Sequence, residues 1–546
     1  MTAEPEPKLL TRVRADLILA VATAAVFARG LGHGLMTSWD DQRFLVDFEP
    51  IQTVSWDHFV AIWSGPHFEA YHPLHLLSYW IDVPLFGPHG PTLHVVSLGL
   101  WIGAALVWMR VFRALGLREW AAFFGALFFA IHPIQIEAVH WATGRKDVLA
   151  ALFAGLATLA HLKSERWSDR ASILSLLAFA AAALSKTTVL PLPIVWVLMD
   201  GVLERRTWRD AGLRQIPATA LAAVLAFVAL GIWQDAEMVR EPLEGFGRVS
   251  LVASSYGHHL GHAVFPYDLS PIYPIHREAP VWSAWFGPIV LVVAAVAAGR
   301  RGKRFELLGL LTFAVLLVPA SNVVPLYFEV QDRYLSLPLI GLALMVAAMA
   351  GELAGRRFAG AGLFLAAYAA ATVFQLGHWR SDEALWASAT HAQPQAFYAW
   401  MKLGEVRRGD GDFAGALRAY DRAIDLEPRL ALGVAARFQT EVLRDEHEYS
   451  LTPSHAEAIT QRFLQGQGDP VALRRLSGDM VQEGYRESVF VPLGRALELA
   501  PIPDGRLAAA ARSQLEQGNA WLAGFYVDQM SDPPQALREQ VNAARN

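Results

Sequence analysis

Apolar residues occur in long blocks over most of the chain, and these blocks stop near residue 377. Windows of roughly 20 residues identify blocks that reach, or nearly reach, the length needed to cross a bilayer. They lie near 15–36, 91–112, 119–135, 147–163, 171–185, 187–201, 216–234, 283–299, 305–320, 335–352 and 358–376. The pattern predicts an all-α, polytopic membrane helix bundle of about eleven spans.

The basic residues between these blocks predict how the bundle is oriented, because cytoplasmic loops carry the excess of lysine and arginine. With the N-terminus inside, the inside segments hold 19 cations, whereas the longer outside segments hold about eight. An odd number of crossings then places the C-terminus outside. We expect an integral, multi-pass protein of a bacterial inner membrane, with a cytoplasmic N-terminus and an outer C-terminal domain.

Composition supports the membrane interpretation and excludes several other classes of protein. Apolar residues make up 54% of the 546 residues and charged residues only 18%, against about 25% charged residues in typical soluble domains. The absence of cysteine excludes a disulfide framework and a thiolate metal site. No basic tract indicates nucleic acid. A cleavable signal peptide is disfavoured because Arg29 interrupts the cleavage zone.

The tail beyond residue 380 has a different pattern, with more charge and a clear 34-residue repeat at 397–430. Its key positions match the spacing of a tetratricopeptide repeat, a hairpin of two helices: Trp400, Leu403, Gly404, Ala416, Tyr420, Ala423 and Pro428. A weaker echo follows at 495–501. We therefore expect a membrane domain at 1–380 and a tetratricopeptide-like helical domain at 381–546. This tail is either a packing appendage or a cradle for a polypeptide.

The strongest indication of chemistry is a pair of acids, Asp40 and Asp41, directly behind Trp39. The pair begins a long first outer loop, 37–90. A carboxylate at this interface can accept a proton from a hydroxyl nucleophile, and partial desolvation would raise its pKa. We expect Asp40 to be the base and Asp41 to position it, although the two roles could be exchanged.

Further polar residues gather at the predicted outer ends of the spans, where charged groups are costly and need a reason. The cations there could bind a phosphate leaving group, and Arg333 is the first candidate because guanidinium grips phosphate with two donors. The other candidates for phosphate binding are Arg145, Lys146 and Lys186. A surrounding vestibule would be formed by His72, His132, Glu137, Asp332 and Tyr334.

Two histidine pairings in these loops could also be interpreted as metal ligands. His132 lies five residues from Glu137, and His72 lies three residues from His75. Only the second spacing places both side chains on one helix face, and a metal site needs more converging ligands than two. Capping or hydrogen bonding to loop backbone explains these residues better, so no metal is assigned.

An ordered set of segments resembles the transmembrane-and-tetratricopeptide O-mannosyltransferases and their bacterial relatives, within the C superfamily of integral membrane glycosyltransferases. The resemblance spans roughly 38–430 and includes Asp332-Arg333-Tyr334. The other segments are Tyr71-His72-Pro73-Leu74 through Leu85-Phe86-Gly87, Ile131-His132-Pro133-Ile134 through Arg145-Lys146-Asp147, Leu184-Ser185-Lys186 and Leu198-Met199-Asp200. The resemblance implies a polyprenyl-phosphate sugar donor, an outer active site and transfer to a protein hydroxyl. It also places Asp40 and Asp41 at the positions of the family's first-loop acids.

Two other functions fit parts of the sequence. A membrane-anchored scaffold for the tail would leave the loop acids and cations unexplained. A transporter of lipid-linked sugars predicts internal symmetry and ionisable groups at mid-membrane, and neither is evident. The favoured function is a glycosyltransferase that moves a sugar such as mannose from a lipid-linked donor, with the acceptor polypeptide contacting the tail.

The predicted orientation can be tested with a reporter that folds only in the cytoplasm. Fused after residue 302, in a cation-rich segment predicted to be inside, the reporter should be active. Fused after residue 380, it should be inactive because the cation bias places this position outside. An active fusion at residue 380 would contradict the topology and separate the acids from the tail.

Overall fold

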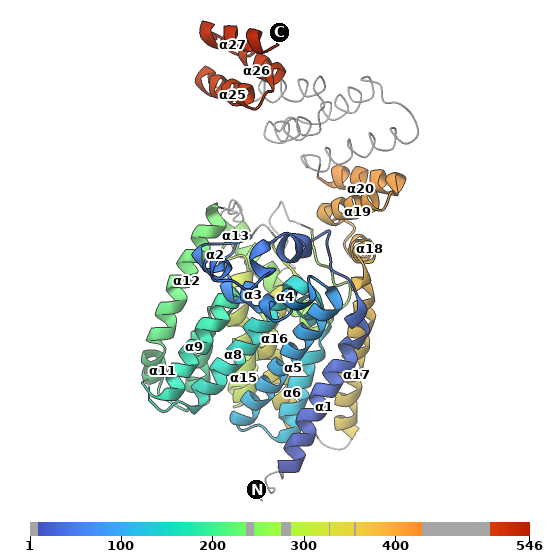
Figure 1. The fold of residues 1–546 in the computed structure, drawn as a ribbon. Helices are drawn as coiled ribbons and strands as arrows, with labels where there is room; N and C mark the ends of the chain where they lie inside the picture. The colour runs from blue at the N-terminus through green and yellow to red at the C-terminus, as the bar shows by residue number, and fades with distance from the viewer. Residues whose placement is uncertain are drawn as a thin grey trace, which may run out of the picture. The chain divides into compact units, whose positions relative to one another are not determined.

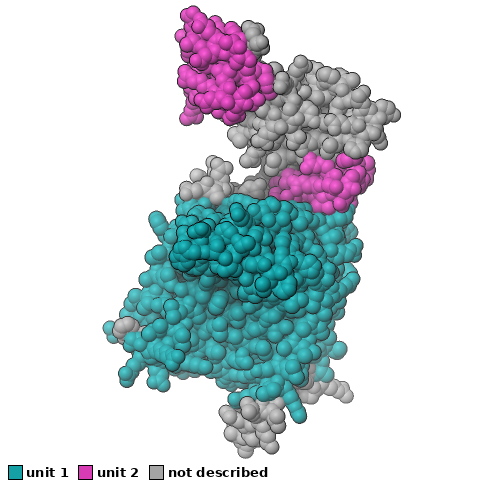
Figure 2. Space-filling model, in the orientation of Figure 1, with its two compact units in different colours: residues 1–393 teal, residues 394–546 magenta. Residues whose placement is uncertain are grey.

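The computed structural model describes residues 9–166, 168–235, 245–274, 285–326, 328–353, 356–427 and 503–545. These residues form helices and loops, with an isolated antiparallel bridge between His67 and Ala70. The predicted all-α class is confirmed. The chain divides into two compact units, 1–393 and 394–546, which Figure 2 colours separately. The proposed domain boundary after residue 380 stays a prediction.

The first unit is a bundle in which long helices run side by side (Figure 1). The tightest neighbours along the chain are α8 with α9 and α15 with α16, and α5 packs on both α6 and α8. The long helices are α1 (Leu9–Phe27), α5 (Gly90–Ala114), α6 (Glu119–Ile131), α8 (Arg145–Lys163), α9 (Arg170–Ser185), α10 (Leu192–Val202), α12 (Ile216–Asp235), α13 (Gly245–Val264), α14 (Phe286–Arg300), α15 (Arg304–Leu317), α16 (Leu339–Gly351) and α17 (Arg356–Leu376).

Several of these helices are long and apolar enough to cross a membrane. Within the described residues, four pass by length and composition: Arg12–Gly32, Gly90–Ala114, Ile216–Gln234 and Ala359–Arg380. A fifth candidate is a pair of helices, Glu119–Ile131 and Pro133–His140, bent by 51°. Four further apolar helices are shorter. The length and apolar composition of these helices indicate a membrane protein. The expected number of eleven spans stays a prediction.

The predicted first outer loop folds into short helices that lie over the end of the bundle away from the N-terminus (Figure 1). Its core is aromatic and aliphatic, and includes Phe44, Leu76 and Tyr79. The short elements are a π-helical turn η2 (Gln42–Val46), η3 (Glu49–Ile51), α2 (Trp56–Ser64), α3 (Pro73–Ser78), η4 (Tyr79–Ile81) and α4 (Val83–Phe86). The loop is thus a folded cap with its own hydrophobic core.

Short helical elements connect the long helices, and α11 (Trp208–Arg214) lies at the end of the bundle opposite the cap (Figure 1). Between α6 and α8 lie η5 (Pro133–Gln135), α7 (Ile136–His140) and η6 (Ala142–Gly144). Later connections contain η7 (Thr187–Val189), α11, η9 (Val318–Ala320) and η10 (Asp332–Leu335), and η1 (Ala28–Gly32) extends α1. The unit closes with η11 (Gly377–Arg380) and α18 (Asp382–Ala392).

A buried ion pair fastens the cap to the bundle. Arg145, the first residue of α8, is completely buried and pairs with Asp82 of the cap, with Nη1 at 3.1 Å and Nη2 at 2.5 Å from its carboxylate. Arg145 also donates to the Ser97 hydroxyl and to the carbonyls of Ser78 and Leu93. Removing one partner of such a pair typically costs about 3–5 kcal/mol.

The second unit contains helical hairpins. Helices α19 (Phe397–Gly409) and α20 (Phe413–Leu426) pack on each other at the position of the expected repeat. A Cβ on Gly404 would meet the Tyr420 ring at 2.5 Å, which explains the small residue there. The remaining described helices are α25 (Asp504–Glu516), α26 (Ala520–Asp528) and α27 (Gln535–Arg545). Pro428 and the echo at 495–501 lie outside the described residues, so the tetratricopeptide assignment stays a prediction.

Helices α15 and α16 cross so closely that only glycine fits at the contact. A Cβ on Gly341 would lie 2.4 Å from both the Gly309 carbonyl oxygen and the Phe313 nitrogen. A Cβ on Gly309 would lie 2.5 Å from the Gly341 carbonyl oxygen. Because all these atoms belong to the backbone, a side chain at either glycine could be accommodated only if the two helices moved apart.

We predict that Gly341→Ala destabilises the protein by about 1–3 kcal/mol, because overpacking displaces backbone. The matched control is Gly360→Ala on α17, where no atom lies within 4 Å of the added methyl group. This control should be neutral or slightly stabilising, because alanine favours a helix by about 1 kcal/mol over glycine. Thermal unfolding in detergent measures both, and equal midpoints for the two variants would contradict the close crossing.

Candidate active site

The two acids at the start of the cap have different surroundings. Asp41 is buried, and its carboxylate accepts hydrogen bonds from the amide of Met36 at 2.9 Å, the amide of Thr143 at 3.0 Å and the hydroxyl of Thr143 at 2.5 Å. Burial raises the pKa of Asp41 to about 6, and the hydrogen bonds oppose this rise. Asp41 therefore joins the start of the cap to the segment that precedes α8.

Asp40 is partly exposed, and within the described residues its carboxylate has no hydrogen bond or ion pair. Its charge acts on Lys146 across the site. Burial lowers the pKa of Lys146 to about 8, and the negative charge of Asp40 works against that shift. Of the two acids, Asp40 is the one whose oxygens are available to a substrate.

Two stacked indoles form the floor of the site. Trp39 lies on Trp141 with ring centroids 4.5 Å apart and planes 17° from parallel. The Arg333 guanidinium lies over both rings, at 5.4 Å from Trp39 and 5.2 Å from Trp141. The Lys146 ammonium is 5.3 Å from the Trp141 centroid. Because Trp39 adjoins Asp40, this indole pair holds two cations and one available carboxylate near each other.

Arg333 is held on one side by an acid and is open on the other. Its Nη1 donates to Glu137, and its backbone amide donates to the same carboxylate at 3.0 Å. Within the described part of the chain, Nε and Nη2 have no protein hydrogen-bond partner. The side chain is 13% exposed. The guanidinium is therefore fixed in place with donors left for an anion.

Lys186 and His72 lie behind Lys146. Lys186 is buried and pairs with Asp147, and burial lowers the pKa of Lys186. The Thr187 amide donates to His72 Nε2 at 3.3 Å, so that nitrogen carries no proton. Burial and the charges of the two lysines lower the pKa of His72 to about 3. A neutral His72 thus orders the turn that carries Lys186.

Arg145 and His132, two of the expected site residues, form hydrogen bonds with protein groups outside the aromatic site. Arg145 is wholly buried against Asp82, as described above, so none of its surface reaches a ligand. Its position corrects the expectation that it binds phosphate, because its donors already serve the ion pair and nearby carbonyls. His132 accepts from the Ile134 amide at 3.2 Å and contacts the Ala263 carbonyl at 3.0 Å. It caps η5, and its place in the expected vestibule stays a prediction.

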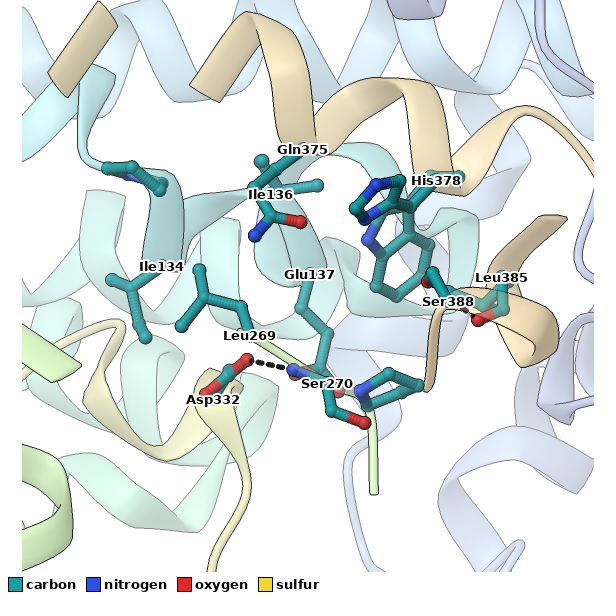
Figure 3. A pocket seen from close by; sticks show the side chains of 13 residues that line it. Ile134, Ile136, Glu137, Leu269, Ser270, Asp332, Gln375, His378, Leu385 and Ser388 are labelled. Atoms are coloured by element: carbon teal, nitrogen blue, oxygen red, sulfur yellow. Dashed lines mark hydrogen bonds between the residues drawn. The ribbon is translucent and has the colours of Figure 1, made fainter. Parts of the chain in front are cut away.

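A pocket opens beside the indole pair, and Figure 3 shows Glu137 near the centre of its lining. Gln375 and His378 lie on one side of Glu137, and Asp332 and Ser270 lie on the other. Trp379 also lines the pocket and is 6.2 Å from Trp39. Two lining residues therefore contact the aromatic site, Trp379 through Trp39 and Glu137 through Arg333, whereas Asp40 does not line the pocket.

Asp332 and Tyr334 flank Arg333 and fix the turn η10. The Asp332 carboxylate accepts from the Ser270 amide at 3.0 Å and from the Tyr273 hydroxyl at 2.8 Å. Tyr334 places its ring 5.8 Å from the Arg333 guanidinium. Both vestibule residues therefore lie at the site, where they support Arg333.

Sequence reasoning did not assign roles to Trp141, Thr143, His262 or Tyr273. Trp141 and Thr143 belong to a segment noted for its polar residues, and the adjoining Gly144 was a signal of tight packing. A Cβ on Gly144 would lie 2.4 Å from the Glu137 carbonyl oxygen. His262 follows His258 by four residues, a spacing that places both on one helix face.

Comparisons with known proteins identify relatives of one kind. No family model matches the chain. Protein O-mannosyl-transferase TMTC4 of Homo sapiens is 26% identical over 74% of this chain and 65% of its own length. Protein O-mannosyl-transferase F38B6.6 of Caenorhabditis elegans is 24% identical over 67% of this chain and 55% of its own. The chain thus spans less than two thirds of the length of these relatives.

A solved structure also aligns with the chain. It is ArnT from Cupriavidus metallidurans bound to undecaprenyl phosphate, with 15% identity, a TM-score of 0.39, and coverage of 96% of this chain and 87% of that one. A shorter match, Protein O-mannosyl-transferase TMTC1 of Mus musculus, reaches 39% identity over 101 residues, which are 18% of this chain and 10% of its own. Over most of its length, the chain is similar to protein O-mannosyl-transferases such as human TMTC4 and F38B6.6 of Caenorhabditis elegans.

Proposed function

We infer that this protein is an integral membrane glycosyltransferase that transfers a sugar, mannose by the names of its relatives, from a polyprenyl-phosphate donor to a protein hydroxyl. One observation carries the proposal: the available Asp40 carboxylate lies beside Arg333 and Lys146 at a single indole pair. A base and anion-binding cations are the two elements that displacement of a sugar phosphate requires.

The reaction assigns a role to each group. The Asp40 carboxylate takes the proton of the acceptor hydroxyl as the hydroxyl oxygen forms a bond to the anomeric carbon. The bond from that carbon to the phosphate oxygen breaks, and the electron pair leaves with the lipid phosphate. Arg333 and Lys146 receive the developing negative charge, because their cations are already in place when it forms.

Burial and charge support this division of roles. Asp41 has both oxygens occupied by Met36 and Thr143, so it positions the loop and is less suited to exchange a proton with a substrate. Lys186, buried against Asp147, adds positive potential from behind. The two indoles offer flat apolar faces beside the charges. Stacking of apolar sugar faces on such rings would orient the donor.

The wider setting of the reaction is part of the same proposal. The cap lies over one end of the bundle, and the cation bias of the sequence places that end on the outer side of the membrane. An acceptor polypeptide would reach the site from that compartment. The helical hairpin α19–α20 has the packing expected of a tetratricopeptide-like unit, which supports a role for the tail in holding the acceptor.

Exchange of each acid for its amide separates the two roles. Asp40→Asn should lower transfer by about 10²–10⁴-fold, because a positioned base is lost, and thermal stability should not change. Asp41→Asn should lower thermal stability by about 1–3 kcal/mol, because its amide nitrogen cannot accept a hydrogen bond from a buried backbone donor. Labelled polyprenyl-phosphate mannose measures transfer, and thermal unfolding measures stability. Normal turnover by Asp40→Asn would show that Asp40 is not the catalytic base.

A conservative change tests Arg333. We expect Arg333→Lys to weaken donor binding by about tenfold or more, because lysine replaces a planar, two-pronged donor with a point charge. Arg43→Lys is the matched control, since Arg43 is an exposed cap arginine that pairs with Glu69. Titration of a polyprenyl-phosphate donor against both variants decides the matter. Equal affinity in Arg333→Lys and Arg43→Lys would show that Arg333 is an interfacial anchor.

A further inference from the structure

A second cluster of polar side chains lies at the edge of the pocket and has the composition of a metal site. His258 and His262 project from α13, and Asp332 begins η10. Their potential ligand atoms all lie within 4.8 Å of one another. We propose that these three residues bind one zinc ion. Zinc binding by these residues does not require the sugar transfer proposed above.

The helix supplies the first two ligands by its geometry. Residues four apart on an α-helix lie on the same face, one turn above the other. The rings of His258 and His262 accordingly have centroids 4.2 Å apart. Two histidines at this spacing on a helix are a recurrent zinc-binding arrangement when a third ligand comes from elsewhere in the chain.

The third ligand is already at the right distance. Nδ1 of His262 lies 3.3 Å from Oδ1 of Asp332. Two ligand atoms that are each about 2.0–2.1 Å from a tetrahedral zinc ion are about 3.3 Å apart. The pair therefore matches one edge of a zinc tetrahedron, and the ligand nitrogen of His258 lies within 4.8 Å of both of these atoms. All three residues come from parts of the chain that the bundle brings together.

Hydrogen bonds orient the carboxylate as in known metal centres, where groups behind the ligands fix their direction. The Ser270 amide donates to Oδ2 of Asp332 at 3.0 Å, which leaves Oδ1 directed at His262. The Tyr273 hydroxyl donates to Oδ1 at 2.8 Å. Ser270 also donates to the Tyr273 oxygen at 3.1 Å, so the hydroxyl is itself held.

The ligand set selects the class of ion. Two imidazoles and one carboxylate suit zinc, whereas magnesium and calcium prefer oxygen ligands. Both histidines are partly exposed, so an ion can reach them from the solvent. Three protein ligands leave a fourth position for water or another group. A bound ion would join α13 to the turn that carries Arg333, and it would add positive charge beside the pocket.

Zinc content of the full-length protein in detergent tests this site. The affinity tag should contain no histidine or be removed, and the protein should be dialysed against chelator and then given Zn²⁺. Elemental analysis should find one zinc per chain, retained in excess Mg²⁺. His262→Ala and Asp332→Asn should lose it, whereas His89→Ala, a change at an exposed cap histidine, should keep it. Failure of the wild-type protein to retain zinc would overturn the proposal, and so would full retention by both ligand variants.

A gentler variant covers the case in which loss of a ligand prevents folding. Tyr273→Phe keeps the ring and removes only the hydroxyl, which lies 2.8 Å from Oδ1 of Asp332 and 3.2 Å from Nδ1 of His262. Loss of such a supporting group typically weakens metal binding by about 10–100-fold. Calorimetric titration of Zn²⁺ into this variant and into wild type should show that shift, and equal affinities would overturn the arrangement. The visible spectrum of the Co²⁺-substituted protein provides a readout of tetrahedral geometry that does not depend on activity.

Discussion

The attachment of the cap to the bundle is the constraint on which the rest of the structure depends. Arg145 and Asp82 are both withdrawn from water, and an ion pair in that environment is tolerated only when its remaining donors are satisfied. The Ser97 hydroxyl and the carbonyls of Ser78 and Leu93 satisfy them. The cost of breaking this network holds the cap in one position over the first turn of α8.

A second attachment, through Asp41, fixes the position of the candidate active site. The Asp41 carboxylate bridges the Met36 amide, at the start of the cap, and Thr143, just before α8. Trp39 lies between Met36 and Asp41, and Trp141 lies two residues before Thr143, so this attachment brings together the two indoles, which stack. One acid of the pair is therefore used to build the site, whereas its neighbour Asp40 is partly exposed. Adjacent residues of the same type thus acquire different chemistry through burial.

The charges of the site are arranged so that each cation is restrained without being neutralised completely. Arg333 is fixed by Glu137 and keeps donors available, while Lys146 rests on aromatic faces. Asp332 lies next to Arg333 in sequence but faces Tyr273 and His262. The turn η10 consequently serves two neighbouring centres, the aromatic site and the proposed zinc site, and it couples their positions.

Local periodicity and spacing are enough to predict the all-α class, the apolar helices and the helical hairpin at α19–α20. The sequence also indicated the acids and most of the cations, since charged groups at the ends of apolar spans are costly and conspicuous. It could not separate Asp40 from Asp41, or Arg145 from Arg333, because burial and hydrogen-bond partners come from residues far away in the chain. The fold gives these residues different surroundings, because it packs Thr143 against Asp41, Asp82 against Arg145 and Glu137 against Arg333. The same long-range packing brought Asp332 to the histidines of α13, a juxtaposition that no local pattern contains.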